Sequence, residues 1–342
     1  MTVTAAVSLV PAGLFSLASG IRFLECFTPA GYDHAADGIL RLAFPADDST
    51  SVVAAAVRQE AGTGGGTGTV RAEFTVHPAA PAPAEAATAE AADDEAVRAQ
   101  LARILSLDVD GTGFPALAAD PVVAGLMADY PGLRPVCFYS PYEAAAWAVI
   151  GNRIRVAQAA VFKARIARRH GQGVHIAGQT LYAFPTPAVL RTITHVPGLT
   201  DIKIQRLHAL AEAALDGQLD AARLRALPSD YALAELRSLP GIGPFSAELV
   251  LIRGAGHPDV FPRHEPRVHR AIATAYGLDG PAAADVSGLA EIADRWRPYR
   301  SWIATLLRTR AAEGTAMPVP HGSGPGRARW AAEPAITRAA PR

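Results

Sequence analysis

Two glycines in one short turn are the clearest candidates for a binding function in this sequence. They lie in the run 239–243, Leu-Pro-Gly-Ile-Gly, which separates two segments of helical periodicity. Gly241 and Gly243 permit positive φ and close backbone approach, so nearby backbone N–H groups can converge on one point. The second helix adds the partial positive charge of its N-terminus, and Ser246 in its first turn can donate a hydrogen bond. The pattern predicts a phosphodiester site, against the alternative of a helix-to-helix turn that binds nothing.

A net charge of zero does not exclude a nucleic-acid ligand, because the charges are unevenly placed along the chain. Residues 1–97 hold 4 Lys and Arg against 12 Asp and Glu, which leaves 28 against 20 for residues 98–342. The second part is therefore basic. Such asymmetry is compatible with one part of the chain facing phosphate, and equally with charges scattered over solvated faces.

Only two cysteines, Cys26 and Cys137, occur in the chain. Two thiols exclude an iron–sulfur or zinc site built from four cysteines of this chain, and we expect neither a metal nor another cofactor. This cysteine usage favours a reduced, cytoplasmic protein. Residues 1–16 carry no basic residue before their apolar stretch, so no signal peptide is expected. No apolar run approaches the roughly 18 to 20 residues that a membrane-spanning helix requires, so we expect no membrane span.

The elements that must hold the turn are predicted to be a small sheet followed by many helices. Residues 38–44 and 69–76 have β-type composition, which favours an N-terminal antiparallel sheet domain over residues 1–77. Residues 14–27 could form a helix or an edge strand. Residues 78–94 consist almost entirely of Ala, Pro, Glu, Thr and Asp, a composition that predicts a linker.

Beyond the linker the apolar periodicity becomes helical and predicts an all-α domain over residues 95–316, so the fold class expected for the chain is α+β. The predicted helices span 95–107, 141–151, 154–169, 187–193, 202–215, 230–238, 245–254, 266–276, 287–297 and 299–312. Ser140, Pro141 and Glu143 form a helix-start pattern in which the serine caps the first turn. Residues 317–342 have little apolar periodicity and predict a disordered tail.

Several segments, taken as a set, resemble the helix-hairpin-helix DNA glycosylase superfamily and, within it, the 3-methyladenine DNA glycosylase II family. The resemblance covers roughly residues 98–313 and, more loosely, an N-terminal sheet domain. It rests on these segments: 239–248, 251–254, 259–262 and 297–302, with 141–159 and 184–187 upstream. It implies a base-excision-repair enzyme that hydrolyses the N-glycosidic bond of a damaged, alkylated base flipped out of duplex DNA. It also implies a monomer that associates with the nucleoid.

Glu265 occupies the position of the acidic residue, normally Asp, that lies four residues after the Phe of a Val-Phe-Pro segment in that family. The resemblance implies that its carboxylate faces the sugar of the extruded nucleotide, stabilises oxocarbenium-like charge and helps to orient the attacking water. Pro266 predicts a helix start, which places Glu265 at the N-cap, where Glu is a poor cap. Helix capping is therefore not expected to be the reason why a glutamate stands at position 265. The alternatives are an exposed glutamate attracted by the helix dipole, or lost activity.

Four further positions are compared with the base pocket of the family. Phe245 stands where strand-cleaving members carry a Schiff-base Lys, which implies a monofunctional glycosylase without lyase activity. Its ring could stack on an extruded base, or it could lie in the core under the turn 239–243, which is the hairpin of the helix-hairpin-helix motif. Leu249 and Arg308 stand where alkylation-repair relatives tend to carry aromatic rings, and this loss weakens the expectation of a cationic base. Trp302 is expected to complete the pocket.

Asn152 and Arg153 fall where the family places the residues that fill the gap left by an extruded base. Arg153 could fill that gap by stacking while its charge meets phosphate, and a surface arginine is the ordinary alternative. The enzyme hypothesis competes with a DNA-binding protein on the same scaffold that has weak or no catalytic activity. Both hypotheses predict DNA binding that weakens with salt.

Overall fold

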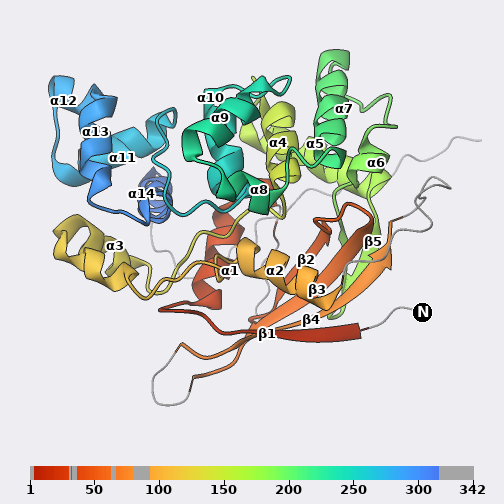
Figure 1. Cartoon of the computed structure of the whole chain (residues 1–342), viewed down its shortest axis with the longest axis horizontal. Coiled ribbons are helices and arrows are strands. Elements are labelled where there is room, and N and C mark those ends of the chain that lie inside the picture. Colours follow the sequence, from red (N-terminus) through yellow and green to blue (C-terminus); the bar gives the residue numbers. More distant parts are fainter. Residues whose placement is uncertain (1–3, 31, 33–36, 63–66, 80–92, 316–342) are drawn as a thin grey trace, which may run out of the picture.

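The structure of the protein is a computed structural model that describes residues 4–30, 32, 37–62, 67–79 and 93–315. The predicted tail and residues 80–92 of the predicted linker lie outside the described residues. Figure 1 shows the N-terminal sheet at one side of the molecule, with the helices grouped above and beside it. The expected architecture, a small antiparallel sheet followed by a largely helical region, is confirmed.

Four antiparallel strands form the sheet in the order β1-β4-β3-β2. They are β1 (Thr4–Leu9), β2 (Leu40–Pro45), β3 (Ser51–Gln59) and β4 (Val70–Pro78). The sequence predicts β2 and β4 but neither β1 nor β3. Strand β3 is buried along its first seven residues, so both of its faces are apolar and the alternation typical of a half-exposed strand is missing.

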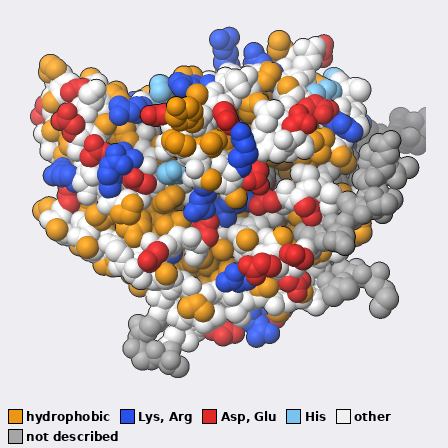
Figure 2. All heavy atoms as spheres, in the orientation of Figure 1, with side chains coloured by type: hydrophobic (Ala, Val, Ile, Leu, Met, Phe, Trp, Pro, Cys, Tyr) orange, Lys and Arg blue, Asp and Glu red, His pale blue; other side chains and the backbone are white. Residues whose placement is uncertain are grey.

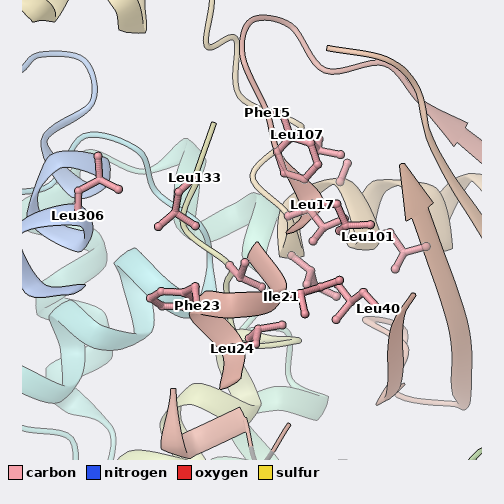
Figure 3. Close-up of a cluster of buried hydrophobic side chains, with 14 of the residues drawn as sticks. Phe15, Leu17, Ile21, Phe23, Leu24, Leu40, Leu101, Leu107, Leu133 and Leu306 are labelled. Atoms are coloured by element: carbon pink, nitrogen blue, oxygen red, sulfur yellow. The ribbon is translucent and has the colours of Figure 1, made fainter. Parts of the chain in front are cut away.

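Helix α1 (Leu17–Cys26) settles the segment that could be a helix or an edge strand. The side chain of Ser16 accepts a hydrogen bond from the backbone N–H of Ser19 at 3.2 Å and so caps the helix. Figure 3 shows Ile21 and Leu24 of α1 close to Leu40 of β2 in one cluster of buried side chains. Helix α1 therefore packs on one face of the sheet.

The opposite face of the sheet is covered by a second, two-stranded sheet, β5 (Gly173–Ile176) and β6 (Gln179–Tyr182). Its turn contains Ala177 and Gly178, both with positive φ, as a two-residue hairpin turn requires. Val174 packs with buried side chains of β2 and β3. The region predicted to be all-α thus contains one β-hairpin, a correction that follows from its docking on the sheet.

Each of the ten predicted helices has a counterpart, and three short helices were not predicted: α3, α8 and α12. The helices between the linker and the turn 239–243 are α2 (Asp94–Ile104), α3 (Pro121–Asp129), α4 (Pro141–Gly151), α5 (Val156–His170), α6 (Pro187–Leu190), α7 (Asp201–Leu215), α8 (Ala221–Ala226) and α9 (Ser229–Ser238). Two 3-10 turns, η1 (Thr28–Ala30) and η4 (Phe114–Ala119), also precede it. The helices after it are α10 (Pro244–Leu249), the π-helical turn η5 (Val250–Gly254), α11 (Pro266–Tyr276), α12 (Gly280–Ala284), α13 (Val286–Asp294) and α14 (Arg300–Thr315).

Two apolar cores hold the helices. The first joins the sheet and α1 to α2, α3, α11, α13 and α14, so the predicted N-terminal domain shares a core with helices far along the chain. The second joins α4, α5, α7, α9, α10 and η5. The domain boundaries stay a prediction. The boundary between the two cores is where the predicted site residues gather.

Candidate DNA-binding cleft

The turn between α9 and α10 has the backbone that its glycines predict. Gly241 has φ +88°, and a Cβ there would lie 2.7 Å from Cδ of Arg206, so both conformation and space require glycine. Leu239 and Ile242 point into the second core, at 8% and 5% exposure. The apolar side chains of the turn therefore anchor it, while its glycines stay at the surface.

Gly243 is the N-cap of α10, and Pro244 is the first helical residue. No side chain caps the amides of this first turn, and Ser246 stands half-exposed within it. A Cβ added to Gly243 would meet nothing within 4 Å. The backbone N–H groups at this helix start are thus open to an incoming anion.

A broad cleft of about 1010 Å³ lies between the two cores and begins at this turn. Nine of the ten predicted site residues line it: Asn152, Arg153, Gly241, Gly243, Phe245, Ser246, Leu249, Glu265 and Arg308. They come from four separate parts of the chain: 152–153, 241–249, 265 and 308. The fold therefore brings together residues whose proximity the sequence only implies.

Trp302 is the exception and corrects the predicted base pocket. It is 2% exposed, packs against Phe114 and Tyr299, and lies under the guanidinium of Arg134 at 5.0 Å. It is not among the residues that line the cleft. Trp302 therefore lies in the interior, where Arg134, Phe114 and Tyr299 pack against its ring.

Phe245 is 44% exposed and lines the cleft, so it does not lie in the core beneath the hairpin. Leu249 lines the cleft one helical turn later on the same helix. The helix predicted as continuous over 245–254 passes from α10 into the π-helical turn η5. Gly254 at its end would place a Cβ 2.8 Å from Cα of Pro141, so η5 and α4 are in close backbone contact.

Glu265 is the N-cap of α11, and its Oε1 accepts the backbone N–H of Arg267 at 3.0 Å. The expectation that capping does not explain Glu265 is therefore wrong, because the longer side chain folds back over the helix start. Its other oxygen, Oε2, has no hydrogen-bond partner in the described part of the chain. The half-exposed carboxylate lines the cleft and keeps one oxygen for a ligand.

Positive charge surrounds this carboxylate. Burial, together with the neighbouring charges of Arg267 and Arg270, lowers the pKa of Arg308, while Glu265 acts to raise it. Arg308 and Glu265 line the same cleft. Arg308 could therefore attract a phosphate or an electron-rich base edge to the part of the cleft that holds the carboxylate.

An aromatic and arginine cluster lines the cleft and was missed by sequence reasoning. The guanidinium of Arg253 lies 5.0 Å from the ring of Phe23 and 4.6 Å from that of Phe27. Burial lowers the pKa of Arg253. Trp147 of α4 lines the same cleft. The spacing of Phe23 and Phe27 places both rings on one helix face, but nothing in the sequence relates them to Arg253.

The predicted gap-filling residues lie at the end of α4. Asn152 is the C-cap of that helix, and Arg153 has φ +57°, in the left-handed region. Lys203 of α7 donates hydrogen bonds to the carbonyl groups of Ile150 at 2.8 Å and Asn152 at 2.9 Å. A lysine from a neighbouring helix therefore fixes the backbone that presents Arg153.

Basic and acidic side chains are interspersed on the face of the molecule in Figure 2. No large basic patch of described side chains covers that face. Among the described residues, no group of three or more His, Cys, Asp or Glu side chains is arranged to hold a metal ion. No helix in the described ranges is long and apolar enough to cross a membrane.

No family model matches the chain. It is 31% identical over 220 residues to the Mycobacterium tuberculosis (strain H37Rv) protein named "Probable bifunctional transcriptional activator/DNA repair enzyme AlkA", a match that covers 62% of this chain and 42% of that protein. It is 30% identical over 190 residues to DNA-3-methyladenine glycosylase 2 of Escherichia coli, covering 54% of this chain and 62% of that protein. The matches span less than two thirds of either relative.

Solved structures with the same fold cover nearly the whole chain. A 3-methyladenine DNA glycosylase from Archaeoglobus fulgidus superposes with a TM-score of 0.68 at 24% identity, over 91% of this chain and 99% of that one. An 8-oxoguanine glycosylase/lyase from Clostridium acetobutylicum, in complex with double-stranded DNA, superposes with a TM-score of 0.57 at 16% identity, over 92% and 98%. The sheet, the helices and the hairpin thus form one known arrangement.

Proposed function

We propose that this chain is a member of the helix-hairpin-helix DNA glycosylase superfamily, and within it of the 3-methyladenine DNA glycosylase II family, and that it is a DNA glycosylase of base-excision repair. It hydrolyses the N-glycosidic bond of a damaged base extruded from duplex DNA. The observation that carries this proposal is the single cleft that joins the hairpin glycines, the residues after α4 and Glu265. A volume of about 1010 Å³ is sufficient for a flipped nucleotide.

The hairpin holds the DNA backbone. Its open amides and the N–H groups at the start of α10 donate hydrogen bonds to a phosphate oxygen, so binding needs few cationic side chains. Arg153, presented by the end of α4, enters the duplex where the damaged nucleotide has left the stack. The enzyme binds its damaged duplex as a monomer, on nucleoid DNA.

Glu265 carries the chemistry. As the bond between C1′ and the base nitrogen breaks, the bonding electrons leave with the base and positive charge develops on the sugar. The carboxylate, with Oε2 available, stabilises that charge and orients the water that adds to C1′. The products are the free base and an abasic site.

The enzyme acts as a hydrolase without strand-cleaving activity. Strand cleavage in this superfamily requires a lysine amine that forms a Schiff base with the sugar. Phe245 occupies that position, and none of the described residues lining the cleft is a lysine. The support is the absence of a suitable amine from the described cleft wall.

The substrate class proposed is an alkylated base, consistent with the names of the sequence relatives. Aromatic rings of Phe23, Phe27, Trp147 and Phe245 line the cleft and can stack on a base. The guanidinium groups of Arg253 and Arg308 disfavour a base with a full positive charge, so neutral lesions belong in any test of specificity.

Single-turnover base release tests the proposal. Duplex oligonucleotides bearing 7-methylguanine, 3-methyladenine, ethenoadenine or hypoxanthine are incubated with the wild type, Glu265→Gln and Glu265→Asp. Wild type is expected to release at least one of these bases, and Glu265→Gln to release it about 100-fold more slowly, because its amide cannot neutralise the developing charge. Glu265→Asp keeps the charge and is expected to retain measurable activity.

The competing function, a DNA-binding protein without catalysis, makes the opposite prediction. Wild type would then bind the duplexes and release none of the four bases. Glu265→Gln activity equal to that of the wild type would instead remove Glu265 from the mechanism while leaving the glycosylase in place.

A further inference from the structure

A second glutamate, Glu248, lies in the wall of the cleft and has no part in the chemistry described above. It is 4% exposed, although a carboxylate is costly to bury without partners. Oε1 accepts the backbone N–H of Arg263 at 3.0 Å, and Oε2 accepts that of His264 at 2.9 Å. Nδ1 of His264 lies 2.7 Å from Oε1. Both oxygens are therefore committed to the segment just before Glu265.

The position of Glu248 in the chain gives these bonds their meaning. It belongs to α10, the same helix whose first turn forms the hairpin site, and it lies five residues after Gly243. Its partners directly precede Glu265, which in turn caps α11. One side chain thus connects the proposed phosphate site to the backbone that carries the proposed catalytic carboxylate.

We infer that Glu248 is a positioning residue that fixes Arg263 and His264, and through them Glu265, relative to the hairpin. This inference rests on the proposed function for its effect on base release. A carboxylate is required because it offers an acceptor oxygen to each of two adjacent N–H groups. A glutamine offers one acceptor, and its NH₂ group would face the second N–H donor.

The same arrangement explains how a glutamate can stand where the family has an aspartate. Glu265 is longer by one methylene and folds over the start of α11 to reach Arg267 N. Its reach into the cleft then depends on where its backbone is held. Glu248 holds that backbone from the hairpin side, and the cap holds it from the side of α11.

The first experiment measures position without relying on activity. Hydrogen–deuterium exchange is compared between wild type, Glu248→Gln and Glu235→Gln. Glu235 is a matched control on the exposed face of α9, where its carboxylate forms an exposed pair with Arg223. The backbone amides of residues 263–265 are expected to exchange about tenfold faster in Glu248→Gln and at an unchanged rate in the control. Unchanged exchange at residues 263–265 in Glu248→Gln would overturn the inference.

The second experiment is a double-mutant cycle on single-turnover base release. Glu248→Gln alone is expected to slow release about 100-fold, since small misplacement of a reacting group has effects of that size, while its affinity for the duplex stays within about twofold. In the Glu265→Gln background, Glu248→Gln is expected to cause no further loss. Equal losses in both backgrounds would show a general structural role and contradict the inference.

Glu248→Asp serves if Glu248→Gln does not fold, as judged by circular dichroism. It keeps the charge but is too short to reach both amides, so it is expected to show the same exchange pattern in weaker form. If wild type releases no base, the proposed function fails, and the exchange experiment still decides whether Glu248 holds the segment.

Discussion

At the scale of single residues, folding does not require a glycine at position 243, so a substitution there can test DNA binding without disturbing the turn. Its φ of −90° and ψ of −178° are open to any residue, and a Cβ there would have free space. Gly241 differs, because its φ is positive and Arg206 occupies the space of a Cβ. Only Gly243 therefore allows a side chain to be added at the hairpin without straining the turn.

Gly243→Val is expected to change the free energy of unfolding by less than about 1 kcal/mol, the range of a changed N-cap. Its affinity for duplex DNA is expected to fall at least about 10-fold, because the added side chain keeps a phosphate away from the amides. Fluorescence anisotropy with a labelled duplex measures this, with Gly243→Ala as an intermediate case. Unchanged affinity in a folded Gly243→Val protein would remove the hairpin from DNA binding.

At the scale of elements, α4 shows how local sequence rules position the site. Ser140 Oγ accepts the backbone N–H of Glu143 at 3.1 Å, and Pro141 fills the first helical position. These choices fix where the helix begins, and its length of 11 residues then fixes where Arg153 emerges. The far end is held by Lys203, a contact that no local rule predicts.

Ser140→Ala is expected to lower the free energy of unfolding by about 1 kcal/mol, the usual cost of a lost N-cap. The loss is expected at the high end, because Ser140 is buried and the freed amide has no access to water. Urea denaturation followed by circular dichroism measures the change. Ser238→Ala, at an exposed helix end, is the control and should change stability by less than about 0.5 kcal/mol; equal losses would argue against the cap.

At the scale of the whole molecule, Arg134 ties the N-terminal segment to the helical region. It is 2% exposed and donates to the carbonyl groups of Leu14 at 3.1 Å, Ser106 at 3.0 Å and Val109 at 3.1 Å, and also to that of Ala12. Its guanidinium also stacks on Trp302. No carboxylate forms a salt bridge with Arg134 in the described part of the chain, so its direct partners are four carbonyl groups and the Trp302 ring.

Arg134→Met is expected to destabilise the protein by about 3 kcal/mol or more, because four carbonyl groups lose their donor in a buried place. Thermal unfolding is expected to remain a single transition at a lower temperature, since the sheet and the C-terminal helices share one core. Arg98→Met is the control, because Arg98 forms an exposed pair with Glu95 and such pairs contribute less than about 1 kcal/mol. A separate early transition of the sheet alone would contradict a shared core.

Features that depend on local backbone rules could be predicted from the sequence alone. The hairpin from Leu239 to Gly243, the start of α4 at Pro141 and the position of Glu265 before Pro266 all follow from residues adjacent in the chain. Glycines and prolines restrict or release backbone angles directly, so these elements could be predicted without tertiary contacts.

The full lining of the cleft could not be predicted from the sequence, because it depends on contacts between distant parts of the chain. Phe23 reaches Arg253 across more than two hundred residues, Trp302 faces the interior because Arg134 covers it, and β3 is buried on both faces by separate elements. Whether a side chain faces a cleft or a core depends on what packs against it from elsewhere in the chain. The same holds for Glu248, whose role appears only when its two amide partners are seen beside it.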